Sequence, residues 1–195
     1  MQIVAHRINT IEELSVLPKN FGAEIDIRTF NNELVLQHDP FKNGESFEEW
    51  MKNFDHELLI LNVKEEGLEV SITKLLEANR INNFFFLDQS FPFLLKTADR
   101  GIKNCAVRFS EFESIETAVS LAGKIDWVWV DRFTEAVIDF ASYRRLKSAG
   151  FKLCFVSPEL HGHATRIEAT AYKEIILKNN IYPDAVCSKF PEIWR

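Results

Sequence analysis

Short apolar runs rich in Val, Ile and Phe alternate with longer amphipathic segments along the whole chain. Polar or turn-forming residues bound the runs, which is typical of buried strands. The runs predict eight strands, at residues 2–6, 22–28, 58–64, 83–88, 104–109, 127–133, 152–157 and 184–189. The segments between them repeat apolar residues with a helical period, most clearly at residues 67–80, 91–101, 113–123, 137–150 and 164–180.

This alternation predicts a parallel sheet whose connecting helices lie outside it. Eight strands is the number that closes a barrel filled by its own side chains. Gly101, Gly123 and Gly150 follow three predicted helices, where a left-handed residue is favoured. An open doubly wound sheet would give the same alternation, but the chain contains neither a GxGxxG nor a GxxxxGKS/T phosphate loop. We therefore predict one compact (β/α)8 TIM barrel over residues 1–195, with an insertion at residues 31–50.

The composition indicates a single large core and excludes several classes of function. With 195 residues, 46% of them hydrophobic, and seventeen Phe, the chain can bury such a core. A net charge of −6 argues against a nucleic-acid-binding protein, whereas a small anionic substrate is compatible with it. Three widely spaced cysteines match neither a disulfide framework nor a zinc site. The sequence shows no signal peptide and no membrane-spanning run, so we predict a soluble cytoplasmic protein.

Two carboxylates occupy alternate positions of the second predicted strand. Glu24 and Asp26 therefore point to the same face, either into the barrel mouth or toward the helices. Two like charges in a poorly hydrated site are costly unless a cation compensates them. A divalent hard cation, Mg²⁺ or Ca²⁺, prefers such oxygen ligands. From the strand alone, a structural pair held by Arg28 or another basic residue is equally compatible.

Two histidines and an arginine stand at neighbouring strand ends. His6 and Arg7 end the first strand, and His38 ends a short extended run just after the carboxylate strand. The carboxyl ends of barrel strands converge on one rim, and that rim holds the active site. A lone histidine is more often structural, but this grouping combines proton transfer with anion binding. We therefore predict an active site there.

These motifs resemble those of glycerophosphodiester phosphodiesterases. That family begins with a His-Arg-Gly strand, continues with Glu-x-Asp and places His-Asp shortly downstream. This chain reads AHRI at 5–8, AEIDIR at 23–28 and LVLQHD at 34–39, and LNVK at 61–64 stands where the family has Glu-x-Lys. The resemblance spans the whole chain, and its specific part is the first forty residues.

The chain departs from the family pattern at several positions. Ile8 replaces the glycine, the Pro-Glu-Asn-Thr stretch after it is missing, and the interval from Glu24 to His38 is slightly short. Asn62 stands where the family supplies a third carboxylate to the metal. An amide oxygen brings less charge to a hard cation, so we expect weaker binding. Asp88, at the end of the fourth strand, is either a replacement ligand or the N-cap of the next helix.

The resemblance implies a metal-dependent hydrolase that acts on small glycerophosphodiester-like substrates and releases an alcohol. It implies that Glu24, Asp26 and Asn62 hold the Mg²⁺ or Ca²⁺ ion. It further implies that Arg7 and Lys64 bind the substrate phosphate.

The resemblance also implies that His6 and His38 act as general acid and base, in either order. Two rival functions remain open. One is a phosphate-ester-binding barrel that has lost turnover and has a regulatory role, which Asn62 and the missing glycine support. The other is a metal-dependent aldolase or isomerase, in which Lys64 would form a Schiff base.

Polar residues near the later strand ends are interpreted as structural. Glu159, His161 and His163 follow the seventh strand, where barrels often bind phosphate, but a solvated loop is favoured. Asp131 and Arg132 are predicted to form a structural pair at the rim.

Overall fold

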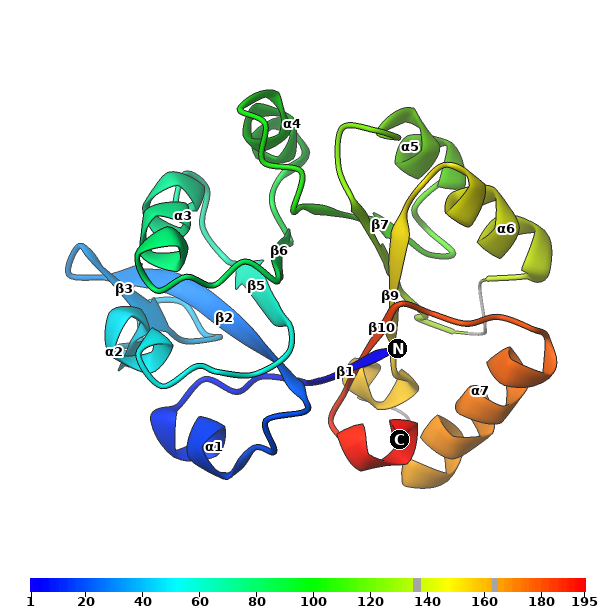
Figure 1. Ribbon diagram of the computed structural model, residues 1–195, viewed down its shortest axis with the longest axis horizontal. Helices are drawn as coiled ribbons and strands as arrows, with labels where there is room; N and C mark the ends of the chain where they lie inside the picture. Colours follow the sequence, from blue (N-terminus) through cyan, green and yellow to red (C-terminus); the bar gives the residue numbers. More distant parts are fainter. Residues whose placement is uncertain (135–137, 163–164) are drawn as a thin grey trace.

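The computed structural model describes residues 1–134, 138–162 and 165–195. A curled β-sheet lies inside a layer of helices (Figure 1). The strands are β1 (Gln2–Ala5), β2 (Gly22–Phe30), β3 (Glu33–Leu36), β4 (Glu45–Ser46), β5 (Leu59–Val63), β6 (Phe84–Leu87), β7 (Ala106–Phe109), β8 (Trp127–Val130), β9 (Lys152–Val156) and β10 (Ala185–Ser188). The α-helices are α1 (Ile11–Val16), α2 (Phe47–Met51), α3 (Glu69–Ala78), α4 (Phe91–Asp99), α5 (Ile115–Ser120), α6 (Phe140–Ser148) and α7 (Arg166–Lys178), and the 3-10 helices are η1 (Pro158–His161) and η2 (Pro191–Trp194).

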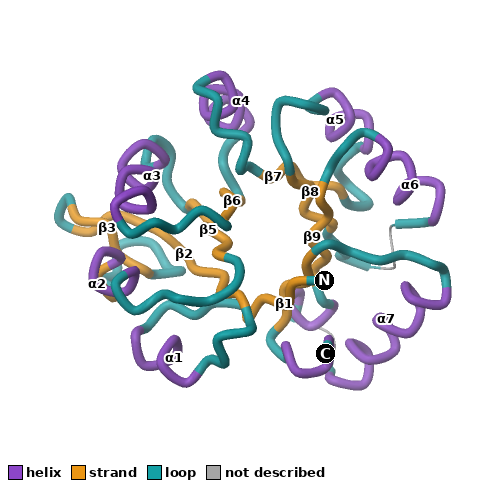
Figure 2. Tube along the Cα trace, viewed as in Figure 1, coloured by secondary structure: helices purple, strands orange, loops and turns teal. Residues whose placement is uncertain are grey.

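Eight strands run parallel around the sheet in the order β6-β5-β2-β1-β10-β9-β8-β7. These are the eight strands that the apolar runs predicted. Between β6 and β7 the described chain has a single bridge, from Phe86 to Cys105, in place of a ladder. The protein therefore has the α/β architecture of the barrel type, with a seam between β6 and β7. Figure 2 shows the strands gathered around the centre and the helices outside them.

The insertion after β2 forms an antiparallel extension of the sheet. β3 pairs with β2, with Leu36 opposite Ile27, and β4 pairs with β3. The N–H of Gln37 then donates to the carbonyl oxygen of Asp26 (2.9 Å). The insertion thereby brings the segment that contains His38 back beside Asp26 of β2.

Alternate side chains of the strands build two separate apolar cores. The inner core lies within the curl and includes Val4, Ile60, Phe85, Leu87, Trp127, Cys154, Val156 and Cys187. The rings of Phe85 and Trp127 stack with their centroids 4.6 Å apart, which connects β6 to β8 inside the sheet. The outer core fills the space between the sheet and the helices and includes the alternating residues Ala23, Ile25 and Ile27 of β2.

Local signals in the sequence fix several helix ends. Thr10 and Glu13 form a reciprocal capping box at the start of α1. Gly101, Gly123 and Gly150 have φ angles of +85°, +76° and +91°, which confirms the predicted left-handed positions. Among the described helices, none has the length and apolar character needed to cross a bilayer.

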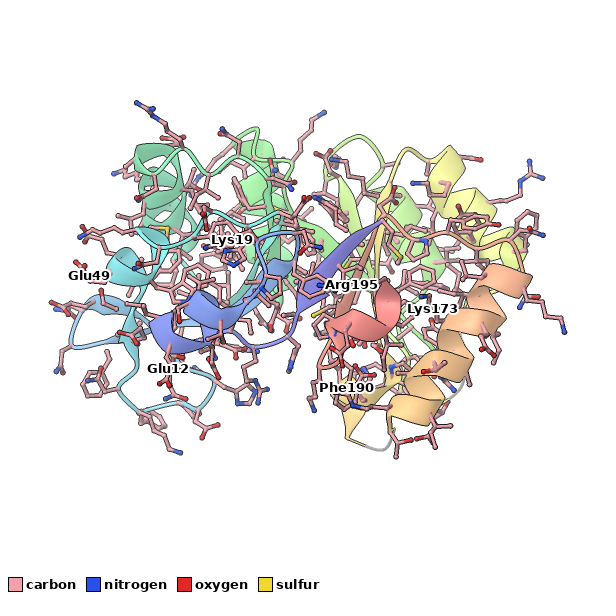
Figure 3. The ribbon with its side chains drawn as sticks, turned by 60° about the horizontal axis from the view of Figure 1, so that its bottom comes forward. Glu12, Lys19, Glu49, Lys173, Phe190 and Arg195 are labelled. Atoms are coloured by element: carbon pink, nitrogen blue, oxygen red, sulfur yellow. The ribbon has the colours of Figure 1, made fainter. Side chains whose placement is uncertain are left out.

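The last turn of the chain is tied to α7 and to the start of β2. Lys173 donates to the main-chain oxygens of Ile193 (2.9 Å) and Arg195 (2.6 Å) (Figure 3). The guanidinium of Arg195 lies 4.7 Å from the ring centroid of Phe21. These contacts hold the C-terminal segment against α7 and against the residue that precedes β2.

Candidate active site

The residues predicted from the motifs meet at the carboxyl ends of the strands. A cavity of about 250 Å³ is lined by His6, Arg7, Glu24, His38, Asn62 and Lys64. Asp26 is buried beside this cavity and contacts two of its wall residues, Arg7 and Lys64. The structure therefore brings all the predicted site residues together.

The two carboxylates of β2 point into the curl of the sheet. Ala23, Ile25 and Ile27 pack in the outer core, so the alternation of the strand turns Glu24 and Asp26 inward. The strand pattern alone left this direction open. β2 continues to Phe30 beside β3, but its parallel pairing with β5 ends at Ile27, so the inward direction places Asp26 near the carboxyl end of the parallel part of the sheet, where barrel sites form.

Glu24 is buried and is held by neutral donors. Its side chain accepts the main-chain N–H of Arg7 (2.8 Å) and Nδ2 of Asn62 (3.0 Å), and Nε2 of His6 lies 3.8 Å away. Burial, reinforced by the neighbouring Asp26, raises the pKa of Glu24 to about 7. An additional cation nearby would favour its charged form.

Asp26 is surrounded by charged and polar donors. Nζ of Lys64 lies 3.0 Å from Oδ1, and Nε of Arg7 lies 3.3 Å from Oδ2. Asn9 donates to Oδ2 (2.9 Å) and accepts the main-chain N–H of Asp26 (2.9 Å). Burial opposes ionisation of Asp26, but Lys64, Asn9 and Arg7 outweigh it and lower its pKa. The two carboxylates of one strand thus have pKa values shifted in opposite directions.

The backbone of Arg7 is strained where it meets Glu24. Its φ of +59° is left-handed, a conformation that costs a non-glycine residue about 1–3 kcal/mol. This conformation lets the N–H of Arg7 reach the Glu24 carboxylate while its guanidinium reaches Asp26. The next residue, Ile8, donates its N–H to the Glu24 carbonyl (2.8 Å), so the strand end is intact with isoleucine in place of glycine.

The two predicted imidazoles differ in their surroundings. Burial, together with the charge of Arg7, lowers the pKa of His6 to about 4, so its ring is neutral near pH 7. The side chain of His38 is 43% exposed, and its Nδ1 lies 3.0 Å from the Asp39 carboxylate. Nε of Arg28 donates to the His38 carbonyl (3.0 Å), and its Nη1 lies 3.7 Å from Glu65. The basic residues that hold Asp26 are therefore Arg7 and Lys64 and not Arg28.

Asn62 stands opposite Asp26 in the register of β2 and β5. Its Nδ2 donates to Glu24, and its Oδ1 is buried without a hydrogen-bond partner among the described residues. A hard cation beside Glu24 and Asp26 would satisfy this oxygen. No cluster of three or more His, Cys, Asp or Glu in the described chain could hold a metal ion. Glu24, Asp26 and the unpartnered Oδ1 of Asn62 nevertheless match in kind the oxygen ligands of a divalent cation, with less charge than three carboxylates would give.

A chain of ion pairs crosses the ends of β6, β7 and β8. Nε and Nη2 of Arg108 donate to Asp88 Oδ1 (2.8 and 2.6 Å), and its Nη1 donates to Asp131. Lys64 lies 4.0 Å from Asp88 and connects this chain to Asp26. The N-cap of α4 is Ser90, so of the two roles left open for Asp88 the capping role is wrong.

Asp131 is fully buried and belongs to the cavity wall. It accepts Nε1 of Trp129 (3.2 Å), and its Oδ1 lies 2.5 Å from Nε2 of His161. The predicted rim pair of Asp131 and Arg132 is therefore wrong, because Arg132 lies over the ring of Tyr172 instead. The predicted solvated loop is wrong as well, since His161 also lines the cavity.

Glu159 is buried and joins the ends of β9 and β10. It accepts hydrogen bonds from the hydroxyls of Ser157 and Ser188 (2.5 Å each) and from the N–H of Lys189 (2.9 Å). This network keeps η1, and with it the cavity wall, attached to the sheet. His163, the third polar residue of this segment, lies outside the described residues.

The sequence interpretation missed Asn9 and Arg108. Arg108 stands in an apolar strand two positions after Ala106, which faces the inner core. A charge on the inner face of a strand end is a signal of a site, and the strand pattern contained it. Asn9 gave no comparable signal, because its role depends on the turn after β1.

Two solved structures share this arrangement of elements. The superposition on a glycerophosphodiester phosphodiesterase from Agrobacterium tumefaciens covers 100% of this chain and 99% of that protein, with a TM-score of 0.68 and 12% sequence identity. The chain has the fold of a glycerophosphodiester phosphodiesterase. The superposition on a glycerophosphoryl diester phosphodiesterase from Parabacteroides distasonis covers 99% of this chain and 84% of that protein, with a TM-score of 0.52 and 15% sequence identity. No protein-family model and no curated protein matches the sequence.

The phosphodiesterase fold agrees with the resemblance seen in the motifs. The likeness in structure extends over the whole chain, as the motif resemblance does. At these identities the likeness establishes the fold alone, and the chemistry depends on the residues of the cavity.

Proposed function

We propose that the protein is a metal-dependent phosphodiester hydrolase that acts on glycerophosphodiester-like substrates. The phosphodiesterase fold supports the proposal. One observation carries it: His6, Arg7, Glu24 and Lys64 line a single cavity at the carboxyl ends of the strands. That end of the sheet is where barrel enzymes bind and convert their substrates.

Arg7 and Lys64 would bind the phosphate of the substrate. Asp26 holds both cations from one side. The guanidinium of Arg7 keeps donors beyond Nε, and its side chain is 45% exposed, so a phosphate can reach it. Cations fixed before the reaction stabilise the charge that develops on the phosphoryl oxygens.

Glu24, Asp26 and Asn62 would hold one Mg²⁺ or Ca²⁺ ion. When bound, the ion supplies Lewis-acid polarisation of a phosphoryl oxygen and lowers the pKa of an attacking hydroxyl group. The N–H of Arg7 and the amide of Asn62 orient the Glu24 carboxylate, and Asn9 orients Asp26. These bonds fix the ligands before substrate arrives.

His6 and His38 would transfer protons on this side of the cavity. A neutral His6 can accept the proton of an attacking hydroxyl, and the half-exposed His38 can exchange protons with solvent. The neighbouring glycerol hydroxyl of the substrate can attack first, which gives a cyclic phosphate and releases the alcohol. Water then opens the cyclic phosphate.

A catalytically impaired phosphate-ester-binding barrel with a regulatory role is the second candidate. Asn62 in place of a carboxylate favours it, as does the partial compensation of Asp26 by Lys64 and Arg7. Such a protein would bind the diester without converting it. A Schiff-base enzyme is disfavoured, because Nζ of Lys64 is held in an ion pair with Asp26.

Phosphorus NMR of the protein with glycerophosphocholine separates the two candidates. A hydrolase replaces the diester signal by a monoester signal, and a chelator suppresses the change. Calorimetry on the same pair measures binding independently of turnover. Binding without turnover would favour the regulatory barrel, and the absence of both would contradict both candidates.

A further inference from the structure

The seam of the sheet carries a second and larger hollow beside the candidate active site. Between β6 and β7 the described chain has a single bridge, and α4 and α5 stand on either side of this seam (Figure 1). A cleft of about 650 Å³ lies between them, lined by residues of α4, β7 and α5. Small-molecule sites usually have about 300–1,000 Å³. The candidate active-site cavity, with about 250 Å³, is small for a whole substrate, whereas the cleft is within this range.

The cleft and the active-site cavity share a wall. Asp88 and Arg108 line both hollows, and Nε and Nη2 of Arg108 donate to Asp88 Oδ1 (2.8 and 2.6 Å). Nζ of Lys64, which lines the cavity, lies 4.0 Å from Asp88. A phosphate bound by Lys64 would therefore lie beside this ion pair. A long group attached to that phosphate has the cleft as its neighbouring space, so the continuity identifies the occupant as a part of the substrate.

Apolar side chains line the cleft from several elements. Leu94 of α4 and Val107 of β7 are buried and line it. Phe91, at the start of α4, and Phe112, after β7, line it as well and are 45% and 77% exposed. Exposed apolar residues that gather at a hollow are typical of a binding site. The cleft therefore offers apolar surface to its occupant.

The charged groups of the cleft are already bonded within the protein. Arg108 is the one cation of its lining among the described residues, and it pairs with Asp88 and Asp131. The carboxylate of Glu113 accepts the hydroxyl of Ser110 (2.6 Å). No unpaired cation of the described lining is left for a second anionic group. These properties favour an uncharged, apolar occupant.

A row of aromatic contacts also connects the mouth of the cleft to the cavity. The ring centroids of Phe112 and Phe133 lie 5.8 Å apart, and the ring of Phe133 lies 4.5 Å from the imidazole of His161, which lines the cavity. The carboxylate of Glu111 accepts the main-chain N–H of Phe133 (3.1 Å) and of Thr134 (2.8 Å). These bonds attach the segment after β8 to the loop after β7. The two hollows are thus joined along the aromatic row as well as through the ion pair.

We propose that the cleft binds a hydrocarbon chain carried by the glycerol of the substrate, so that the protein acts on glycerophosphodiesters with one acyl chain. The inference rests on the proposed function and narrows its substrate class. With the phosphate at Arg7 and Lys64, the chain lies in the cleft against Phe91 and Phe112. Such a substrate keeps the free glycerol hydroxyl that attacks in the proposed reaction. The chain therefore adds binding and leaves the chemical steps unchanged.

Two matched esters test the role of the cleft. Glycerophosphocholine and its octanoyl ester, with the chain on the terminal glycerol oxygen, share the phosphate, the choline and the attacking hydroxyl. Both are assayed at concentrations where they are monomeric, which excludes an effect of a lipid surface. The parent should have a kcat/KM about tenfold or more higher for the octanoyl ester, because burial of methylene groups strengthens binding.

Variants of the cleft should remove this preference. Thr117 lines the cleft from α5 and is exposed, so Thr117→Trp fills the space without disturbing the core. It should lower kcat/KM for the octanoyl ester by about tenfold and that for glycerophosphocholine far less. Phe112→Ala should reduce the preference as well, and it provides a second measurement if the Trp variant folds poorly.

Two control variants carry the same substitutions outside the cleft. Thr170→Trp changes an exposed position of α7, and Phe41→Ala removes a ring that is 97% exposed. Neither residue lines the cleft, so both variants should keep the parent's preference for the octanoyl ester.

The outcomes separate the inference from the function on which it rests. If the parent converts both esters with equal kcat/KM, the inference is overturned and the hydrolase proposal stands. A preference that survives in both Thr117→Trp and Phe112→Ala would also overturn the inference, because the chain would then bind outside the cleft. A parent protein that converts neither ester would overturn the hydrolase proposal and the inference with it.

Discussion

The two sides of the cavity use the same kinds of residue in different states of pairing. On the side of β2 and β5, burial raises the pKa of Glu24 to about 7, and Oδ1 of Asn62 has no partner among the described residues. On the side of β7 and β8, Asp131 is bonded to Arg108, Trp129 and His161. The difference suggests that the two sides of the cavity have different roles. The incompletely paired side is suited to take up a cation and a phosphate, and the fully paired side is suited to hold one imidazole in place.

The largest expected effect is on turnover, from the side of β2 and β5. His6→Ala and His38→Ala should each lower kcat by about 10²–10⁴, the range for losing one acid–base group. Steady-state assays on glycerophosphocholine measure the loss. His56→Asn is the matched control, because His56 lies outside the cavity and contacts the Leu17 carbonyl. Full activity of either variant would remove that histidine from the mechanism.

The second-largest expected effect is on the free energy of unfolding, from the ion pairs on the side of β7 and β8. Arg108→Ala leaves Asp131 buried without the guanidinium that pairs with it, so the free energy of unfolding should fall by about 3–5 kcal/mol. Arg145→Ala is the control, because its pair with Glu116 lies at the surface and its loss should be undetectable. Urea unfolding compares the two variants. Equal stabilities would show that the paired side does not depend on Arg108.

The position where the chain leaves the family pattern should respond to metal. Asn62→Glu adds a third negative charge beside Glu24 and Asp26, which strengthens binding of a hard cation and increases repulsion without it. The variant should melt at a lower temperature than the parent in chelator. A tenfold gain in affinity would add about 1.4 kcal/mol of stability at a fixed ion concentration. If Mg²⁺ and Ca²⁺ raise the melting temperature of the variant no more than that of the parent, Asn62 does not face the ion.

The smallest effect concerns the pH dependence of the parent in chelator. The pKa of Glu24 lies above its ordinary value of 4.5, so the folded state binds more protons than the unfolded state between about 4.5 and about 7. The contribution of Glu24 to the free energy of unfolding therefore falls as the pH rises from about 4.5 to about 7. Glu24→Gln should flatten the fall and melt above the parent at pH 8. Parallel pH profiles for the two proteins would contradict the raised pKa.

The contrast between the two sides also explains what the sequence could predict. Strand–helix alternation predicted the eight parallel strands, because each apolar run has the length and pattern of a buried strand. The meeting of His6, Glu24, Asp26 and His38 around one cavity could be predicted because their motifs are local in the chain.

The paired side was misinterpreted because its partners are distant in sequence. Asp131 binds Arg108, which precedes it by 23 residues, and His161, which follows by 30. Only the curl of the sheet brings these three together. Adjacency along the chain suggested Arg132 as the partner of Asp131, and adjacency carries no information about which strand ends meet.

Turnover during a metal titration tests the central claim most directly. Chelator-treated parent protein and Glu24→Gln would be supplied with glycerophosphocholine while Mg²⁺ or Ca²⁺ is raised. We predict that the parent's turnover rises from background to saturation and that the variant stays near background throughout, because it lacks one charged ligand. A folded parent without turnover at any concentration of either ion would contradict the proposal that the protein is a phosphodiester hydrolase.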